Sequence, residues 1–552
     1  MRSSSSPRKR WVSATGAFLA ATLILGACGG GSDNGADKPK SEDSSKPVYG
    51  GKLVYALEAE SADGWCLPEA QLAIAGIQVA RTIYDTLTAP NVDGDYVPFL
   101  AESVTPNADF TEWTIKVREG VKFHNGTALD ATVVKNNLDA YRGTYPARNP
   151  LLFRFVYSNI KDVAVKDPLS VTVTMNSPWS AFPAALYGSG RIGIMAQEQL
   201  DDPDTCDTKL IGTGPFSLVE WAQNDHLLTK KNPDYWGTDA DGGKLPYLDE
   251  VEYRPIIEAS SRTNALLGGD INALHTATPE QIDALRNAAD EGKVTNLESD
   301  KFAEVTFGQL NNSKEPFNNK NARLAVISAL DVETFNESRN LGINQIANGP
   351  FAPGNMGYLK DTGYPKFDLE KAKGYAAAYK KETGKDLAFT LISTPDAATK
   401  ASAQLAQQMA EKANIKVTLT DMEQAALIST AISGDFDAMV FRNYPGGDPD
   451  SNYNWWKSDS PVNFSKFNDP DIDRLLDEGR HTDDKAKRTT IYEDVNKRFG
   501  EEGYSMWLYW VIWDISTAPE VHGVLGPKLP DGSEPFPGLA VGNPVSGMWI
   551  DQ

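Results

Sequence analysis

The feature that most constrains the fold is a regular alternation of helix and strand patterns between residues 368 and 441. Expected helices and strands take turns along the chain, in the order helix 368–382, strand 387–392, helix 397–413, strand 415–420, helix 423–433 and strand 438–441. Gly384 and Gly434 follow two of the helices, at the position where glycine commonly ends a helix. Such alternation predicts right-handed crossovers and a mostly parallel sheet in an α/β protein.

Open sheets of this kind bind ligands outside the carboxyl ends of their strands, at a topological switch point. The strand expected at 438–441 runs into the loop 442–450, which begins with Arg442, Asn443 and Tyr444 and contains Asp448. This loop is the first candidate for ligand contact.

The first residues predict an export signal. Four basic residues and no acidic one precede a small, apolar run at 14–27, which is the layout of a secretory signal peptide (1–27) and is too short to span a bilayer. Gly26, Ala27 and Cys28 resemble the lipobox of bacterial lipoproteins, in which the cysteine is acylated. Cys28 is therefore the expected lipid anchor, holding the protein on the extracytoplasmic face of the cell membrane. An ordinary secretory signal is the alternative.

Residues 28–49 are the expected tether between this anchor and the folded protein. Only one apolar residue, Ala36, occurs in 29–46, so the segment cannot bury enough surface to fold by itself. A flexible coil of this length has an end-to-end distance of roughly 25 Å.

Net charge and cysteine content indicate which partners and which disulfide to expect. The chain has a formal net charge of −22, and without the four basic residues of the signal it becomes −26, so a nucleic-acid partner is not expected. If Cys28 carries lipid, Cys66 and Cys206 remain as an even pair in an exported protein. A disulfide between them is expected. Two separately buried thiols are the alternative.

The sequence contains few of the motifs that are typical of catalytic or metal sites. No Gly-x-Ser-x-Gly, His-Glu-x-x-His or phosphate-loop motif occurs, and the five histidines lie far apart in the sequence. The stretch 469–473 has some features of a calcium loop, but Arg474 and Arg480 occupy the positions that need glycine and glutamate. We therefore expect no enzyme activity, metal or cofactor. A glycosidase pair among the many carboxylates stays open, because only spatial separation could reveal it.

Several ordered motifs carry a resemblance to a known family. They lie at 100–104 (LAESV), 113–127 (WTIKVREGVKFHNGT), 211–221 (IGTGPFSLVEW), 231–237 (KNPDYWG), 248–255 (LDEVEYRP), 318–331 (NNKNARLAVISALD) and 467–476 (FNDPDIDRLL). In this order they resemble the peptide/nickel group, family 5, of extracellular solute-binding proteins that serve ABC importers. The likeness covers roughly residues 50 to 525.

The resemblance implies an α/β, type II periplasmic-binding-protein-like clamshell of two lobes with an inserted domain. The expected parts are lobe one (50–83, 205–302 and 517–552), the inserted domain (84–204) and lobe two (303–516), with boundaries good to about ten residues. The chain would pass between the lobes twice, and the two crossings would form a hinge. A monomer that captures a small-molecule or peptide ligand and delivers it to ABC permease subunits is expected.

The expected ligand contacts are Glu58, Trp65, Arg442, Asn443, Tyr444, Asp448 and Trp510. Members of the resembling family that bind peptide amino termini carry an aspartate three residues before an Asp/Glu-Pro pair, and Pro445 stands there in this chain. Asp448 or Glu58 would have to replace that carboxylate, while Arg442 could hold a ligand carboxylate as a bidentate fork. A surface ion pair for Arg442 is the alternative. A modified peptide, an oligosaccharide or another small organic solute thus stays open beside a peptide.

Overall fold

The computed structural model describes residues 46–61, 64–395, 397–444, 446–541 and 545–551. The chain forms two units, Met1–Lys46 and Pro47–Gln552, and all the helices and strands of the described residues lie in the second. The expected signal peptide and the lipid anchor Cys28 lie outside the described residues, as does the tether up to residue 45. Within the described ranges, no helix has both the length and the apolar character that crossing a membrane requires.

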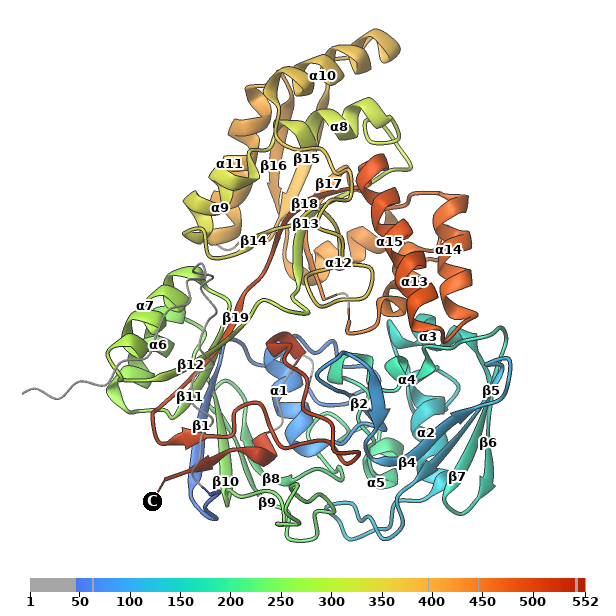
Figure 1. Cartoon of the computed structure of the whole chain (residues 1–552), viewed down its shortest axis with the longest axis vertical. Coiled ribbons are helices and arrows are strands. Elements are labelled where there is room, and N and C mark those ends of the chain that lie inside the picture. The colour runs from blue at the N-terminus through green and yellow to red at the C-terminus, as the bar shows by residue number, and fades with distance from the viewer. Residues whose placement is uncertain (1–45, 62–63, 396, 445, 542–544, 552) are drawn as a thin grey trace, which may run out of the picture. The chain divides into compact units, whose positions relative to one another are not determined.

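A seven-stranded mixed sheet contains both early and late parts of the chain (Figure 1). Its spatial order is β12 (Thr295–Ser299), β19 (Trp513–Thr517), β11 (Ala273–Thr276), β1 (Lys52–Leu57), β10 (Glu250–Pro255), β9 (His226–Lys231) and β8 (Phe216–Ala222). The central strand β1 runs parallel to β10 and β11, and the other neighbours are antiparallel. The helices that pack on this sheet are α1 (Ile74–Ile83), α6 (Ala259–Gly268) and α7 (Pro279–Asp290).

Residues 88–201 build a separate antiparallel sheet. Its strands are β4 (Ala101–Pro106), β5 (Glu112–Val117), β7 (Ser170–Met175) and β6 (Ile160–Asp167), accompanied by the pair β2 (Thr88–Pro90) and β3 (Tyr96–Pro98). Alternate residues of β5 are buried, as the alternating sequence predicts. The helices here are α2 (Ala131–Tyr141), α3 (Phe153–Val156), α4 (Phe182–Ala185) and α5 (Gln197–Asp201). Asp130 caps α2 by accepting a hydrogen bond from the Val133 amide at 2.9 Å, as expected.

The six-stranded sheet contains the alternating segment. Its spatial order is β14 (Gln345–Ile346), β18 (Ser505–Trp510), β13 (Val305–Leu310), β17 (Ala438–Asn443), β15 (Ala388–Ser393) and β16 (Lys416–Asp421). The three strands of the alternating segment, β17, β15 and β16, run parallel to one another, as predicted. The sheet as a whole is mixed rather than mostly parallel, because β13, β14 and β18 come from outside that segment and join antiparallel.

Helices lie on both faces of this sheet (Figure 1). They are α8 (Lys320–Ala329), α9 (Val332–Asn340), α10 (Leu369–Thr383), α11 (Ala397–Glu411), α12 (Gln424–Ser433), α13 (Tyr453–Trp456), α14 (Pro470–Arg480) and α15 (Lys485–Glu502). Asp469, the first residue of the calcium-loop-like stretch, caps α14 by accepting hydrogen bonds from the amides of Asp471 and Ile472. A short pair, β20 (Val521–His522) and β21 (Trp549–Ile550), lies near the end of the chain.

The chain passes twice between the six-stranded and seven-stranded sheets. One crossing joins β12 to β13, and the other joins β18 to β19 through Val511 and Ile512 alone. The aromatic segment 504–515 contributes to two strands in different sheets, which Figure 1 shows as a nearly continuous path. The Val511 amide donates to the Glu304 carbonyl at 2.9 Å, so the two crossings are hydrogen-bonded to each other.

The domain division predicted from the sequence stays a prediction, since Pro47–Gln552 forms one compact unit.

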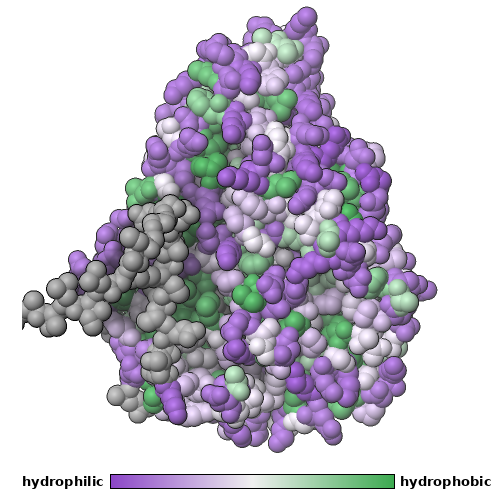
Figure 2. Space-filling model, viewed as in Figure 1, coloured by the Kyte–Doolittle hydropathy of each residue, from purple (hydrophilic) through white to green (hydrophobic). Residues whose placement is uncertain are grey.

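The face of the molecule in Figure 2 is mainly hydrophilic, with apolar atoms in scattered patches.

Candidate ligand-binding site

Charged side chains gather where the two crossings meet the six-stranded sheet. Arg442, near the end of β17, places Nη2 2.5 Å from Oε2 of Glu304, which directly precedes β13. The same carboxylate oxygen accepts a hydrogen bond from Nε1 of Trp513 at 3.2 Å. The Arg442 side chain is 47% exposed and that of Glu304 only 11%. Glu304 is thus fixed by two donors, and Arg442 keeps other donors for a further group.

Arg442 lines a cavity and is a positive charge at its wall. Burial disfavours its charged form, but Glu304 and Glu58 outweigh that effect and raise the pKa of Arg442.

Glu58, directly after β1, supplies the opposite charge from the seven-stranded sheet. Burial raises the pKa of Glu58, with Arg442 and Arg262 acting against it and Glu304 adding to it. Among the described residues the Glu58 carboxylate has no hydrogen-bond or ion-pair partner, and it is half-buried. A carboxylate in this state can accept hydrogen bonds from a bound cation.

A cavity of about 280 Å³ begins beside Arg442. It extends between the six-stranded sheet and helices α8, α9 and α11, and residues Ala277–Glu280 at the start of α7 line its other side. Thr306 lies opposite Arg442 on one side and Tyr509 on the other, so these three side chains form a row across β17, β13 and β18 that lines the cavity. We call them the cross-strand row.

The loop after β17 is held by buried ion pairs. Asp450 accepts from Arg480 at 2.8 and 3.2 Å and from Nε1 of Trp179 at 2.7 Å, and the Arg480 guanidinium lies over the Tyr453 ring. Trp179 comes from the part of the chain that contains the four-stranded sheet. This network fixes the loop against that region.

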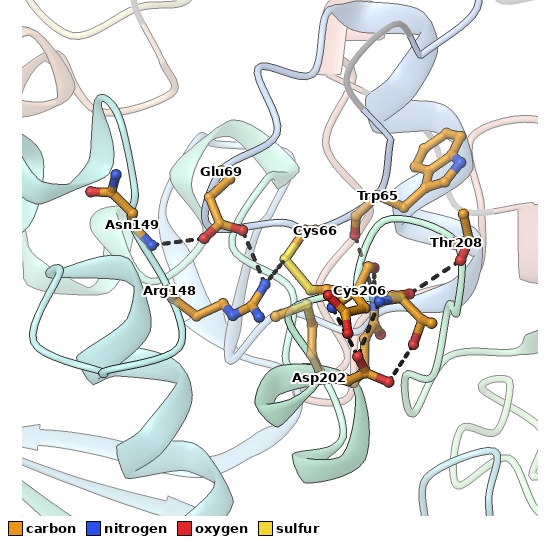
Figure 3. Close-up of a disulfide and its surroundings, with 12 residues drawn as sticks. Trp65, Cys66, Glu69, Arg148, Asn149, Asp202, Cys206 and Thr208 are labelled. Atoms are coloured by element: carbon orange, nitrogen blue, oxygen red, sulfur yellow. Dashed lines mark hydrogen bonds and ion pairs between the residues drawn. A yellow bond between two sulfur atoms is a disulfide. The ribbon is translucent and has the colours of Figure 1, made fainter.

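The disulfide lies away from the charged cluster. Cys66 and Cys206, the pair expected from the sequence, are joined with 5.0 Å between their Cα atoms (Figure 3). Glu69 lies close to both sulfurs, a grouping that could hold a metal if the thiols were free. The two sulfurs are bonded to each other instead, and Arg148 Nη1 contacts Cys66 Sγ at 2.7 Å and Glu69 Oε2 at 3.2 Å.

Comparison with known proteins decides the family. The sequence model of the bacterial extracellular solute-binding proteins, family 5 (middle), matches residues 95–464, two thirds of the chain. The chain belongs to this family. It is therefore an extracytoplasmic solute-binding receptor of the kind that serves ABC importers.

Curated relatives of this solute-binding protein cover most of its length. The probable D,D-dipeptide-binding periplasmic protein DdpA of Escherichia coli K12 is 27% identical over 453 residues, which is 80% of this chain and 83% of the relative. The oligopeptide-binding protein AppA of Bacillus subtilis 168 is 25% identical over 520 residues, 89% and 92% of the two chains. The glutathione-binding protein GsiB of Escherichia coli K12 is 27% identical over 470 residues, 80% and 85%.

Solved structures confirm the fold class. The binding protein AgaA of Agrobacterium tumefaciens R10, in complex with agropinic acid, superposes with a TM-score of 0.77 at 26% identity, covering 91% of this chain and 99% of AgaA. AppA of Bacillus subtilis with a nonapeptide gives 0.76 at 22% identity, covering 92% and 100%. The solute-binding protein thus has the expected α/β fold of type II periplasmic binding proteins.

The structure brings some predicted contact residues together. Glu58 and Arg442 are close enough to shift each other's pKa. Tyr444 lies near Glu304, which together with Tyr96, Tyr187 and, above all, burial raises the pKa of its hydroxyl. Glu58, Arg442 and Tyr444 thus come from two different sheets and meet at the crossings.

The other predicted contact residues already have partners within the protein. Asn443 donates to Asn452 Oδ1 at 3.2 Å, and both oxygens of Asp448 accept from Arg488 at 2.7 Å. Trp65 and Trp510 are 1% and 4% exposed and pack against other aromatic rings. Asp448 is therefore already paired, and the ligand role of these four residues stays a prediction.

Sequence reasoning missed Glu304 and Thr306. Glu304 is a single acidic residue between apolar Ala303 and Val305, at the boundary predicted between two lobes. A charged residue at the start of a buried strand, next to a predicted lobe boundary, could have marked Glu304 as a candidate site residue. Nothing in the sequence marked Thr306, because its importance depends on which neighbours it has across the sheet.

Proposed function

We propose that this receptor captures a peptide-like solute between its two lobes and passes it, chemically unaltered, to the permease subunits of an ABC importer. The observation that carries this proposal is the pair of opposite charges, Glu58 after β1 and Arg442 in β17, which belong to different sheets and are close enough to shift each other's pKa. A peptide has an ammonium and a carboxylate, which these two side chains complement.

The relatives support the peptide class. Their names describe binding of D,D-dipeptides, oligopeptides and glutathione. Glu58 replaces the amine-pairing aspartate of the resembling proteins, and Arg442 receives the carboxylate. Asp448 does not serve as the replacement in this proposal, because Arg488 occupies both of its oxygens.

Closure follows from contacts that exist only when both lobes touch the solute. A shift from 1:99 to 99:1 in favour of the closed form takes about 5.5 kcal/mol of differential binding. A solute held between Glu58 on one side and Arg442 on the other supplies such contacts. Small-angle scattering that showed no compaction at saturation would contradict this mechanism.

A second candidate is a small organic solute other than a peptide, such as an oligosaccharide or a modified amino acid. Two observations favour it: Pro445 stands where peptide-binding members carry aspartate, and the AgaA complex contains agropinic acid. The receptor role would be the same.

The receptor is proposed to be a monomer, anchored by lipid on Cys28 at the extracytoplasmic face of the cell membrane. The lipobox-like Gly26-Ala27-Cys28 and the polar segment behind it support this anchor. Palmitate labelling should mark the wild type and spare a Cys28→Ala variant. An unlabelled wild type would contradict lipidation without touching the binding proposal.

Native mass spectrometry of freshly purified protein tests the ligand class directly. We expect a co-purified peptide, and we expect added peptide to raise the melting temperature without being consumed, as RT ln(1 + [L]/Kd) requires. Co-purification of a sugar or another organic acid would support the second candidate. Turnover of the solute would contradict the receptor role.

A further inference from the structure

The cavity beside Arg442 is apolar through most of its length. Strand residues Leu391, Val440 and Leu508 line one side, and Val326 of α8 and Phe335 of α9 line the other. The polar groups of the cross-strand row line it on the sheet side, and Arg339 of α9 and Glu280 of α7 add charged groups elsewhere in the lining. The cavity is thus amphipathic, with mainly apolar walls and charged side chains at several points around it.

Small residues create this space. Ala403, Ala406 and Ala410 follow helical spacing on one face of α11 and line the cavity. Gly308 of β13 lies among the facing strand residues, and a Cβ there would come within 2.1 Å of the Met506 side chain. Protein interiors are normally packed as densely as organic crystals, and an empty cavity costs stability in proportion to its volume. Larger side chains at these alanines would have filled it.

Thr306 is the second observation that points to an occupant. It is 5% exposed, and its hydroxyl has no hydrogen-bond partner among the described residues. Buried hydroxyls are normally paired. Thr306 lines the cavity beside Arg442, which places this unpaired hydroxyl next to the space that an occupant would fill.

Residues from the region of the seven-stranded sheet also line the cavity. Ala277–Glu280 lead from β11 of the seven-stranded sheet into α7, and they line the cavity opposite the six-stranded sheet. An occupant would therefore contact the segments on both sides of the crossings. This position suits a group whose binding favours closure.

The volume of the cavity limits the size of the group that can bind in it. An apolar cavity of roughly 150 Å³ is enough for benzene, and whole-ligand pockets begin at roughly 300 Å³. About 280 Å³ therefore holds one aromatic ring or a branched aliphatic chain, and the remainder of a peptide-sized solute must lie outside.

We propose that this cavity is the specificity subsite of the receptor and takes one large apolar side chain of the captured solute. The inference rests on the proposed function, since the polar backbone of the same solute is held at Arg442 and Glu58. The substrate class is thereby narrowed to peptide-like solutes with an aromatic or large aliphatic side chain.

The test compares four tripeptides by isothermal titration calorimetry: tri-alanine, and the three peptides in which phenylalanine replaces one alanine. Burying a phenyl group predicts that at least one phenylalanine peptide binds the wild type about tenfold or more tightly than tri-alanine. In Ala406→Phe the new ring occupies the cavity, so the ratio between the affinities for the phenylalanine peptides and for tri-alanine should fall to about one. Gln404→Phe adds the same ring on the exposed side of α11 and should keep the preference.

The outcomes separate the two proposals. Tri-alanine binding with no phenylalanine preference, or a preference that survives in Ala406→Phe, would overturn the subsite and leave the receptor function standing. Binding of none of the four peptides would overturn the peptide assignment and the subsite together. Folding is checked by melting temperature, which Ala406→Phe should maintain or raise because it fills existing space. A large drop in both phenylalanine variants would instead show that α11 tolerates no added ring, and Val440→Phe, on the opposite wall, then decides the question by the same preference.

Discussion

Arg442 and Glu304 form an ion pair in which the carboxylate is enclosed and the guanidinium is half open. Glu304 is held in addition by Trp513, whereas Arg442 lines the cavity and its side chain is half exposed. The ion pair therefore fixes the orientation of the Arg442 guanidinium and leaves some of its N–H donors for a ligand.

Replacing Arg442 should weaken solute binding much more than folding. We expect Arg442→Ala to lose at least about tenfold in affinity for the tightest peptide, and Arg442→Lys to recover part of it, because lysine keeps the charge but lacks the planar fork. Titration calorimetry measures both. Arg474→Ala on exposed α14, which breaks an ordinary surface pair with Glu478, is the control. Unchanged affinity in Arg442→Ala would remove this residue from the site.

The Asp450 network should dominate the stability of the loop after β17. Asp450→Ala leaves Arg480 buried without its partner and removes the acceptor of Trp179, and loss of one member of such a pair costs about 3–5 kcal/mol. Urea unfolding measures this loss. Asp471→Ala, whose pair with Arg474 is exposed, should change stability by less than about 0.5 kcal/mol. Equal effects from the two variants would refute the argument.

Thr306 and Thr229 offer a matched pair of buried threonines. The hydroxyl of Thr229 donates to the Val251 carbonyl at 2.9 Å, whereas that of Thr306 has no partner among the residues described. Without solute, Thr306→Val should be neutral or stabilising by about 1 kcal/mol, and Thr229→Val should destabilise by a similar amount. Melting curves distinguish the signs. Destabilisation by Thr306→Val would mean that its hydroxyl is paired.

Asp514 in β19 should give stability a measurable pH dependence. Burial raises the pKa of Asp514 from 3.8 to about 7. The folded protein then keeps a proton that the unfolded chain has released, so the contribution of this group is full below about pH 4 and is lost as pH rises through 7. The loss amounts to at most about 4 kcal/mol.

Asp514→Asn, neutral at every pH, isolates this effect. Its melting temperature should be near that of the wild type at about pH 4 and increasingly higher as pH rises to about 7, with no further divergence above that pH. Burial, with a smaller effect of Arg262, lowers the pKa of His275 to about 3, which opposes the trend but is common to both proteins. Parallel melting profiles from pH 4 to 7 would contradict the shift.

The disulfide should stabilise the fold strongly, because it closes a loop of 140 residues. The chain-entropy model gives about 4–5 kcal/mol for loops of this length. Cys66→Ser/Cys206→Ser should therefore melt well below the wild type, and dithiothreitol should lower the wild-type melting temperature but not that of the double variant. In a Cys28→Ser background, thiol titration of denatured, unreduced protein should find no free sulfhydryl; two would contradict the bridge.

Much of the local structure could be predicted from the sequence, because it depends on short-range physics. The caps Asp130 and Asp368, the glycine stops Gly384 and Gly434, and the alternating strand β7 all depend on neighbouring residues. The run 70–87 is apolar at helical spacing throughout, but only Ile74–Ile83 is helical, and the apolar residues on either side of it are buried without helical structure.

The sequence did not allow us to predict the directions of all the strands or which residues come together at the site. Periodicity shows that β13 and β18 are strands, but not that they pair antiparallel with each other in the six-stranded sheet. The same limit applies to the site. Arg442 and Glu58 carry chemistry that can be read from the sequence, whereas the space beside them depends on alanines of α11 that look like ordinary helix formers.

The link between β18 and β19 is two residues long, and it is hydrogen-bonded to the other crossing at Glu304. In the closure proposed above, two short, coupled connections would leave little freedom for twisting or sliding, so the lobes would move by rotation about a single axis. Such a rotation would bring the lobes into the same alignment each time they close, and a permease could then recognise the closed form by its shape, independently of the bound solute.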